Sequence, residues 1–120
     1  VYVADSENHC VRKISPDGEV KTIAGIPGKE GGKDFPATDA TIRRPMGVAL
    51  DASGNVYVAC FADGIRKIAP DGQVTRLVGI DEGTQKKAQF GILNGIAIDE
   101  SGNIYFTDSC FVRKITMTRQ

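Results

Sequence analysis

The stretch 47–78 reads GVALDASGNVYVACFADGIRKIAPDGQVTRLV and contains four short β-prone segments separated by turn residues. Its first turn contains Gly54, which can adopt positive φ at little cost. Its last turn, Pro70-Asp-Gly72, combines a proline that presets φ, an aspartate that can cap the turn and a glycine for the left-handed position. No part of the chain has helical periodicity over about ten residues. We therefore predict four antiparallel strands, at 47–51, 55–59, 65–69 and 73–78.

Parts of this stretch recur elsewhere in the chain. GVALDASGN at 47–55 returns as GIAIDESGN at 95–103, and IRKIAPDGQV at 65–74 resembles VRKISPDGEV at 11–20. A four-stranded unit that repeats every ~40–50 residues is typical of β-propeller blades. We therefore predict an all-β chain of four-stranded antiparallel propeller blades. The expected division is an incomplete blade at 1–25, a complete blade at 43–79 and an incomplete blade at 92–120, with loops at 26–42 and 80–91.

The phrase Asp5-Ser-Glu-Asn-His9, the Arg-Lys-Ile strand and the Gly-Val-Ala-Leu-Asp strand together resemble NHL repeats. The resemblance covers nearly the whole chain outside the linking loops and implies a six-bladed propeller. The second unit departs from the pattern at 60–64, and the third is two residues shorter at 108–111. The predicted strands come as three, four and three, so copies laid head to tail would break the pattern. We expect a part of a longer propeller, with an oligomer or a self-standing partial propeller as alternatives.

Composition excludes few classes of protein. The 15 basic and 15 acidic residues cancel, so no global field favours nucleic acid or an anionic membrane. A hydrophobic content of 41% is ordinary for a soluble globular protein, and no run approaches the ~18 apolar residues of a membrane span. Cys10, Cys60 and Cys110 lack metal-ligand spacing, so we expect thiols in or beside strands and a mild preference for a reducing compartment. We predict no metal site and no cofactor.

Strand direction predicts where recognition takes place. Because strands alternate, the long connections 26–45 and 80–94 emerge on the same face as the loops after each second strand, and short turns occupy the other face. Variable loops on a rigid support commonly carry recognition. We therefore predict that this long-loop face binds a partner, in the first place another protein. The candidate residues are Asp5, Asn8, His9, Lys29, Lys33, Phe35, Arg43, Arg44, Phe61, Asp63, Lys86, Lys87 and Asp108, and the structural turn glycines are Gly18, Gly54, Gly72 and Gly102.

Several of these residues have structural interpretations beside the functional one. The single histidine, His9, is expected to form a hydrogen bond to a neighbouring loop and so orient its turn. Asp5 and Asp108 occupy equivalent positions and could face a calcium ion, but carboxylates that accept from turn N–H groups are the simpler prediction. Cys60 at the third equivalent position argues against a shared ring of ligands. In the first long loop we expect Phe35 and Ile42 to be tucked beneath the chain.

Arginine recurs at one position in each unit, as Arg12, Arg66 and Arg113, each followed by lysine. We expect each arginine to pair with an acidic group between blades, such as Asp5 or Asp51, and each lysine to be solvated. The alternative is a basic surface for single-stranded RNA, which needs basic residues interleaved with stacking aromatics. Residues of that kind are Lys29, Lys33, Arg43, Arg44, Lys86 and Lys87 with Phe35 and Phe90, although acidic residues interrupt them.

An enzyme is the remaining alternative. Some six-bladed propellers related to the NHL pattern are metal-dependent lyases or lactone hydrolases, whose ligands converge on a central channel. The strand-one segments nearest that channel, 47–50 and 95–98, offer little to coordinate a metal, so such ligands would lie in further blades. The leading prediction from the sequence is a protein-interaction scaffold, with the enzyme as the alternative and RNA binding as the second alternative.

Overall fold

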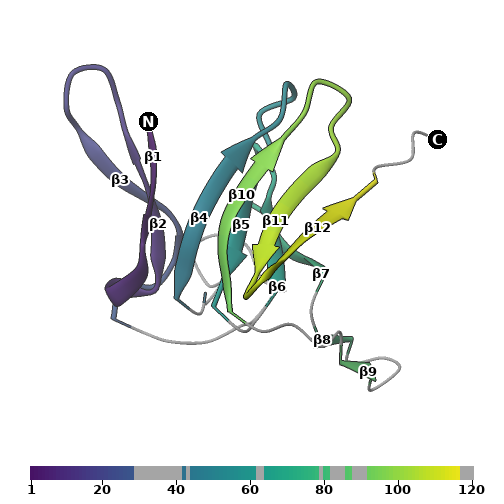
Figure 1. Ribbon diagram of the computed structural model, residues 1–120. Helices are drawn as coiled ribbons and strands as arrows, with labels where there is room; N and C mark the ends of the chain where they lie inside the picture. Colours follow the sequence, from purple (N-terminus) through teal and green to yellow (C-terminus); the bar gives the residue numbers. More distant parts are fainter. Residues whose placement is uncertain are drawn as a thin grey trace.

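The computed structural model describes residues 1–28, 42, 44–61, 64–78, 80–81, 86–87 and 92–116. They form three antiparallel sheets of three, four and three strands, and a small two-stranded hairpin (Figure 1). The first sheet has the order β1-β2-β3, the second β4-β5-β6-β7 and the third β10-β11-β12. The strands are β1 (Tyr2–Asp5), β2 (Cys10–Ile14), β3 (Val20–Gly25), β4 (Pro45–Leu50), β5 (Val56–Cys60), β6 (Gly64–Ile68), β7 (Val74–Val78), β8 (Ile80–Asp81), β9 (Lys86–Lys87), β10 (Leu93–Ile98), β11 (Ile104–Asp108) and β12 (Phe111–Ile115).

The predicted strands agree with the observed ones to within one or two residues at each end, which is the usual uncertainty of strand limits. The predicted all-β class is confirmed, and the described part of the chain adds only one turn of 3-10 helix, η1 (Ser6–Asn8). One difference lies in the second predicted loop, 80–91. There β8 and β9 pair through Ile80 with Lys87 and Asp81 with Lys86. The residues of this hairpin are not part of the repeated phrases, so the repeat gave no signal for it.

The three sheets pack as neighbours through β1, β4 and β10. β4 lies against β1 on one side and against β10 on the other, as Figure 1 shows. All five residues of β5 are buried, because the second sheet is covered on both faces. The turns after β4 and β10 lie at the top of Figure 1, and η1 lies at the bottom. The end of β3 and the start of β4 lie on the side of η1, which we call the long-loop face, and the turns after β4 and β10 lie on the opposite, short-turn face.

The recurring Asp-x-Ser-Gly-Asn phrase builds the turn between the first two strands of a blade. The Asp51 carboxylate accepts hydrogen bonds from the Ser53 N–H (2.9 Å), the Asn55 N–H (3.0 Å) and the Tyr57 hydroxyl (3.0 Å). Asp99 repeats these contacts with Ser101, Asn103 and Tyr105. Burial raises the pKa of Asp51, but the hydrogen bonds from Asn55, Tyr57 and Ser53 outweigh it and leave that pKa below its ordinary value. The repeated phrase therefore stabilises the turn, and the Asp51 and Asp99 carboxylates accept hydrogen bonds from groups of their own turn and strand.

The turn glycines have the backbone conformation that these turns require. φ is 90° at Gly18, 88° at Gly54, 92° at Gly72 and 86° at Gly102. An L residue with a side chain rarely adopts such values. The Cβ that a substitution would add at Gly54 has ordinary space, 3.6 Å from the Pro70 ring, so the need for glycine there is conformational.

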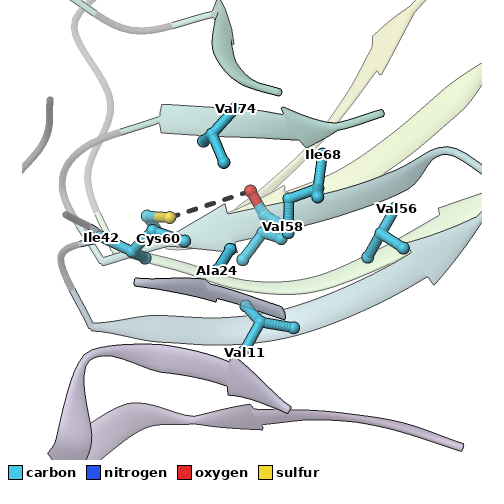
Figure 2. Packing of buried hydrophobic residues seen from close by; sticks show 8 residues of the cluster. All are labelled: Val11, Ala24, Ile42, Val56, Val58, Cys60, Ile68 and Val74. Carbon is cyan, nitrogen blue, oxygen red and sulfur yellow. Dashed lines mark hydrogen bonds between the residues drawn. The ribbon is translucent and has the colours of Figure 1, made fainter. Parts of the chain in front are cut away.

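Two apolar clusters fill the seams between the sheets. The first joins Val11 and Ala24 of the first sheet to residues of the second, and Figure 2 shows these side chains converging. Its buried members are Val11, Ala24, Ile42, Val56, Val58, Cys60, Ile68 and Val74. The second cluster joins Tyr57, Ala59 and Ile65 to Leu93, Ile104 and Phe106. The predicted burial of Ile42 is confirmed, since its side chain is inaccessible to solvent, whereas Phe35 lies outside the described residues.

The cysteines are free thiols with different environments. Cys10 and Cys60 are buried in strands β2 and β5, and Cys110 is exposed in the turn after β11. Burial raises the pKa of the Cys10 thiol above its ordinary value. Among the described residues, no helix has the length and apolar character needed to cross a membrane.

Candidate functional site

The candidate site lies on the long-loop face, where the first sheet meets the second. The η1 turn of the first sheet stands beside the residues that lead into β4. Ser6 fixes this contact, since its hydroxyl donates to the Pro45 carbonyl oxygen at 2.6 Å. His9 adds a second contact, because its Nδ1 accepts the backbone N–H of Arg44 at 3.0 Å. His9 therefore has the structural role that its sequence context predicted.

Arg44 is the centre of this junction. Its guanidinium lies 3.4 Å from the Glu7 carboxylate, and its Cζ lies 5.2 Å from the centre of the Phe61 ring. The Arg44 carbonyl also accepts the backbone N–H of Phe61 at 2.9 Å. The side chain of Arg44 is 43% exposed and that of Glu7 87% exposed, so both reach the surface. We call Glu7, Arg44 and Phe61 the Arg44 cluster.

The backbone at this junction is strained at two positions. φ is 55° at His9 and 35° at Arg44, and both residues carry side chains that disfavour positive φ. Ser109, at 53°, is the third such residue in the described part of the chain. Conformations of this kind cost on the order of 1–3 kcal/mol each and persist only where the surrounding contacts hold them. Two of these three residues, His9 and Arg44, are in contact at this junction, because the His9 ring accepts the Arg44 N–H.

Asp5 does not accept turn N–H groups, and this expectation was wrong. Its carboxylate accepts from the Asn8 side-chain amide at 3.0 and 3.2 Å and from the Arg12 Nε at 2.9 Å. The hydrogen bond from Asn8 and then the one from Arg12 hold the pKa of Asp5 below its ordinary value. Arg12 continues the network to the Thr22 hydroxyl at 3.1 Å. The carboxylate therefore organises the η1 turn through side chains.

Asp108 repeats the pairing in the third sheet, where its carboxylate accepts from the Arg113 Nε at 2.6 Å. Asp5 with Arg12 and Asp108 with Arg113 are two ion pairs that each lie within one sheet, and not between blades as expected. The reason is the register: an aspartate at the end of the second strand and an arginine two residues into the third lie on the same face of the pair. In the second sheet Cys60 replaces the aspartate, and Arg66 is fully buried.

The lysines that follow these arginines were expected to be solvated. Lys13 and Lys114 are exposed, and each lies over a tyrosine ring of its own sheet, at 5.6 Å from Tyr2 and 5.5 Å from Tyr105. Lys67 is partly buried. The prediction therefore holds for two of the three.

A shared backbone contact explains how the shortened third unit keeps its fold. The residue after the second strand donates its N–H to the residue before the first strand, from Phe61 to Arg44 and from Ser109 to Ile92, both at 2.9 Å. The N–H of Ile92 is accepted by the Ser109 hydroxyl at 3.1 Å, whereas that of Arg44 is accepted by His9 of the preceding sheet. The first junction therefore ties two sheets together, and the second closes one sheet on itself.

The structure thus brings five of the predicted site residues together at the first junction: Asp5, Asn8, His9, Arg44 and Phe61. Asp108 lies apart in the third sheet, and Lys86 and Lys87 form β9. Lys29, Lys33, Phe35, Arg43 and Asp63 lie outside the described residues. The sequence assigned no role to the Ser6 and Glu7 side chains, although both residues belong to the Asp5–His9 phrase, and it expected Arg12 to pair with an acidic group without placing it at the site.

The described residues include no group of three or more histidine, cysteine or acidic side chains placed to hold a metal ion. The polar groups of the junction are instead arranged to fix the positions of their neighbours. What the junction offers at its surface is a guanidinium, a carboxylate and an aromatic ring in defined positions.

Similarities to known proteins bear on the fold. No family model matches the chain. A structural genomics protein of unknown function from Bacteroides thetaiotaomicron superposes with a TM-score of 0.82 at 27% identity, over 94% of this chain and 31% of that one. An auxiliary nutrient binding protein from Bacteroides ovatus gives a TM-score of 0.76 at 20% identity, over 96% of this chain and 34% of that one.

Curated relatives match shorter segments. Protein SUPPRESSOR OF QUENCHING 1, chloroplastic, from Arabidopsis thaliana is 38% identical over 60 residues, which are 49% of this chain and 6% of that protein. Adipocyte plasma membrane-associated protein from Gallus gallus is 29% identical over 78% of this chain and 22% of its own length. Protein STRICTOSIDINE SYNTHASE-LIKE 3 from Arabidopsis thaliana is 37% identical over 55% of this chain and 16% of its own length.

The chain spans less than a quarter of the length of each of these relatives and about a third of each of these solved structures. The sheets, their antiparallel order and the propeller-fold neighbours agree with one another. The chain has a β-propeller fold, built from antiparallel blades of three and four strands.

Proposed function

We propose that this chain is a protein-binding module whose partner contacts the long-loop face at the Arg44 cluster. One observation carries the proposal. Arg44 is partly exposed, its backbone N–H is hydrogen-bonded to His9, and its guanidinium lies over the Phe61 ring at the junction of two blades. Arginine and aromatic residues are enriched in the cores of protein interfaces and among the residues that contribute most to binding.

Preorganisation supports this function. Immobilising a long side chain on binding costs about 0.5–1.5 kcal/mol, and contacts made before binding reduce that cost. His9 fixes the Arg44 main chain, and the Phe61 ring orients the guanidinium. The strained φ of Arg44 points the same way, because such conformations concentrate at sites that bind ligands or partners.

Charge supports it as well. The contact of Arg44 with Glu7 is long, at 3.4 Å, and Glu7 is almost fully solvated. Exposed ion pairs of this kind contribute roughly 0–1 kcal/mol, so an acidic group of a partner can replace Glu7 at little cost. The cluster is therefore suited to a partner that presents a carboxylate beside an apolar side chain.

The test begins with partner proteins that co-purify with the full natural polypeptide, each then purified and titrated against it. Arg44→Glu is expected to weaken binding of the true partner by at least about tenfold, which corresponds to about 1.4 kcal/mol. Lys114→Glu is the matched control, because it reverses the charge of an exposed side chain in the third sheet. Equal affinities for Arg44→Glu and the unaltered protein would overturn the proposal.

A second variant separates binding from folding. Arg44→Gly removes the side chain but relieves the positive φ of 35°. We expect its thermal unfolding temperature to match or exceed that of the unaltered protein while its affinity for the partner falls. A variant that keeps its affinity would show that the Arg44 side chain has no part in recognition.

An enzyme is the second candidate, because two relatives are named strictosidine synthase-like, at 37% and 34% identity over a little more than half of this chain. Further blades would then supply the reacting groups, and this chain would act as one wall of the propeller. Metal analysis of the full natural polypeptide tests the metal-dependent form of this candidate. A stoichiometric zinc or calcium ion, lost together with an activity on chelation, would favour the enzyme over the binding module.

A further inference from the structure

A cross-strand row of three side chains marks the short-turn end of the first sheet. Tyr2 on β1 lies opposite Lys13 on β2, and Lys13 lies opposite Lys21 on β3. Residues directly opposite one another in antiparallel strands have side chains on the same face of the sheet. The Lys13 ammonium lies 5.6 Å from the centre of the Tyr2 ring. The row therefore places two cations and one aromatic ring side by side.

The lysine pair is unfavourable for the fold. Like charges directly opposite across a sheet destabilise it. In the second sheet the equivalent pair is Lys67 with Thr75, which has no such repulsion. The first sheet thus keeps a local repulsion that the repeat shows to be unnecessary for building a blade.

Two adjoining hollows share Lys13. The smaller one, of about 150 Å³, is lined by Lys13, Ser15, Glu19 and Lys21, so it has two ammonium groups against one carboxylate. The larger one, of about 300 Å³, lies between the first two sheets. Tyr2, Ile23, Val56 and Ile68 give it apolar and aromatic surface, and Pro70 lies at its wall. Ligand sites are typically concave and largely apolar, with a few well-placed polar groups.

The two hollows differ in the ligand groups that they favour. Lys13 and Lys21 favour an anion in the smaller hollow, whereas the Ser15 hydroxyl there already donates to the Asp17 carboxylate. The apolar and aromatic side chains that line the larger hollow favour an apolar ligand group there. Asp71 also lines the larger hollow, where its carboxylate accepts the Gln73 N–H at 3.0 Å, so an anionic group is disfavoured at that end. An amphipathic anion would therefore lie with its charged group in the smaller hollow and its apolar group in the larger one.

We propose that this seam binds a small organic anion, with a phosphate or carboxylate group between Lys13 and Lys21 and an aromatic or branched apolar group against Tyr2, Ile23 and Ile68. The site goes beyond the protein-binding proposal, because it lies on the short-turn face, away from the Arg44 cluster. The repulsion between the lysines is relieved when the anion binds, which explains why the pair is tolerated.

The experiment is calorimetric titration of the full natural polypeptide at low ionic strength with four probes: phenyl phosphate, benzoate, inorganic phosphate and phenol. Phenyl phosphate or benzoate is expected to bind at least about tenfold more tightly than inorganic phosphate and phenol, because only they fill both hollows. Added salt should weaken this binding, since both lysines are exposed.

Lys21→Thr is the decisive variant, because it copies the lysine–threonine pair of the second sheet. It is expected to weaken binding of the preferred probe by at least about fivefold while the unfolding temperature stays equal or rises. Lys114→Thr, which alters the lysine of the third sheet at the repeat position of Lys13, should leave the affinity unchanged. Unchanged affinity in Lys21→Thr, or no binding of either organic anion at about 10 mM, would overturn the proposal.

Discussion

Replacement of Gly47 by alanine tests how closely the second and third blades pack. A Cβ at this position would lie 2.5 Å from the Asn94 carbonyl oxygen and 3.4 Å from the Ile96 side chain. The nearest atom belongs to the backbone of the next sheet, so the two sheets must move apart. Overpacking of this kind costs about 1–3 kcal/mol. We therefore expect Gly47→Ala to destabilise the protein by about 2 kcal/mol.

Gly95→Ala is the matched control, since Gly95 occupies the same repeat position in the third sheet. Among the described residues, its Cβ would meet the Thr107 side chain, at 3.6 Å, which is an ordinary contact. Neither glycine has positive φ, so the loss of backbone freedom in the unfolded chain stabilises both variants alike, by about 0.4–1 kcal/mol. The difference between the two variants therefore isolates the steric cost at the seam.

Calorimetry of the full natural polypeptide and both variants measures this difference. Since 1 kcal/mol shifts the unfolding temperature by roughly 2–8 °C, depending on chain length, we expect Gly47→Ala to unfold at least about 4 °C below Gly95→Ala. Equal unfolding temperatures would refute the reasoning, because they would mean that the Asn94 carbonyl does not lie against Gly47.

Three further predictions concern the turns and the junction. His9→Ala removes the acceptor of the Arg44 N–H and is expected to lower the free energy of unfolding by about 1–3 kcal/mol in chemical denaturation. His9→Asn should recover part of this loss, because asparagine tolerates positive φ and offers an acceptor, and equal stability of all three proteins would contradict this role. Gly54→Val places a β-branched residue at a φ of 88° and is expected to cost about 1–3 kcal/mol, so an unaltered unfolding temperature would show that the turn is built differently. Hydrogen bonds, first from the Asn103 backbone and then from its side chain, hold the pKa of Asp99 below its ordinary value. The stabilisation by Asp99 is therefore present above the unfolded pKa and is lost as the pH falls through the folded pKa. Asp99→Asn should lose less stability than the unaltered protein in acid unfolding below about pH 4, and parallel pH profiles would exclude this contribution.

The fold could be predicted from the sequence because the repeat carries it. The Asp-x-Ser-Gly-Asn phrase marks the turn after a first strand, and the Pro-Asp-Gly phrase marks the turn after a third strand. Each phrase has a local physical cause, namely a carboxylate that accepts turn N–H groups or a glycine at positive φ. Repetition then fixed the strand phase. The β8–β9 hairpin escaped prediction because its residues are not part of the repeated phrases.

The candidate site could be predicted only in part. His9 was assigned correctly, because one histidine in a turn needs a partner on a neighbouring loop. Asp5 was expected to pair with an arginine between blades, but it pairs with Arg12 of its own sheet, because the two residues lie on one face of β1 and β2. The positive φ of Arg44 had no sequence signal at all, since it is imposed by contacts to His9 and Phe61 from two different sheets. Such features depend on tertiary packing.

The most direct test of the proposed function is amide hydrogen exchange of the full natural polypeptide with and without its purified protein partner. Protection is expected at 5–9, 44–46 and 60–61, where η1, the start of β4 and the end of β5 meet on the long-loop face. The turns at 15–19, 51–55 and 69–73 should exchange at unchanged rates, because they lie on the opposite face. Protection confined to those turns, with none around Arg44, would contradict the assignment of the long-loop face as the protein-binding surface.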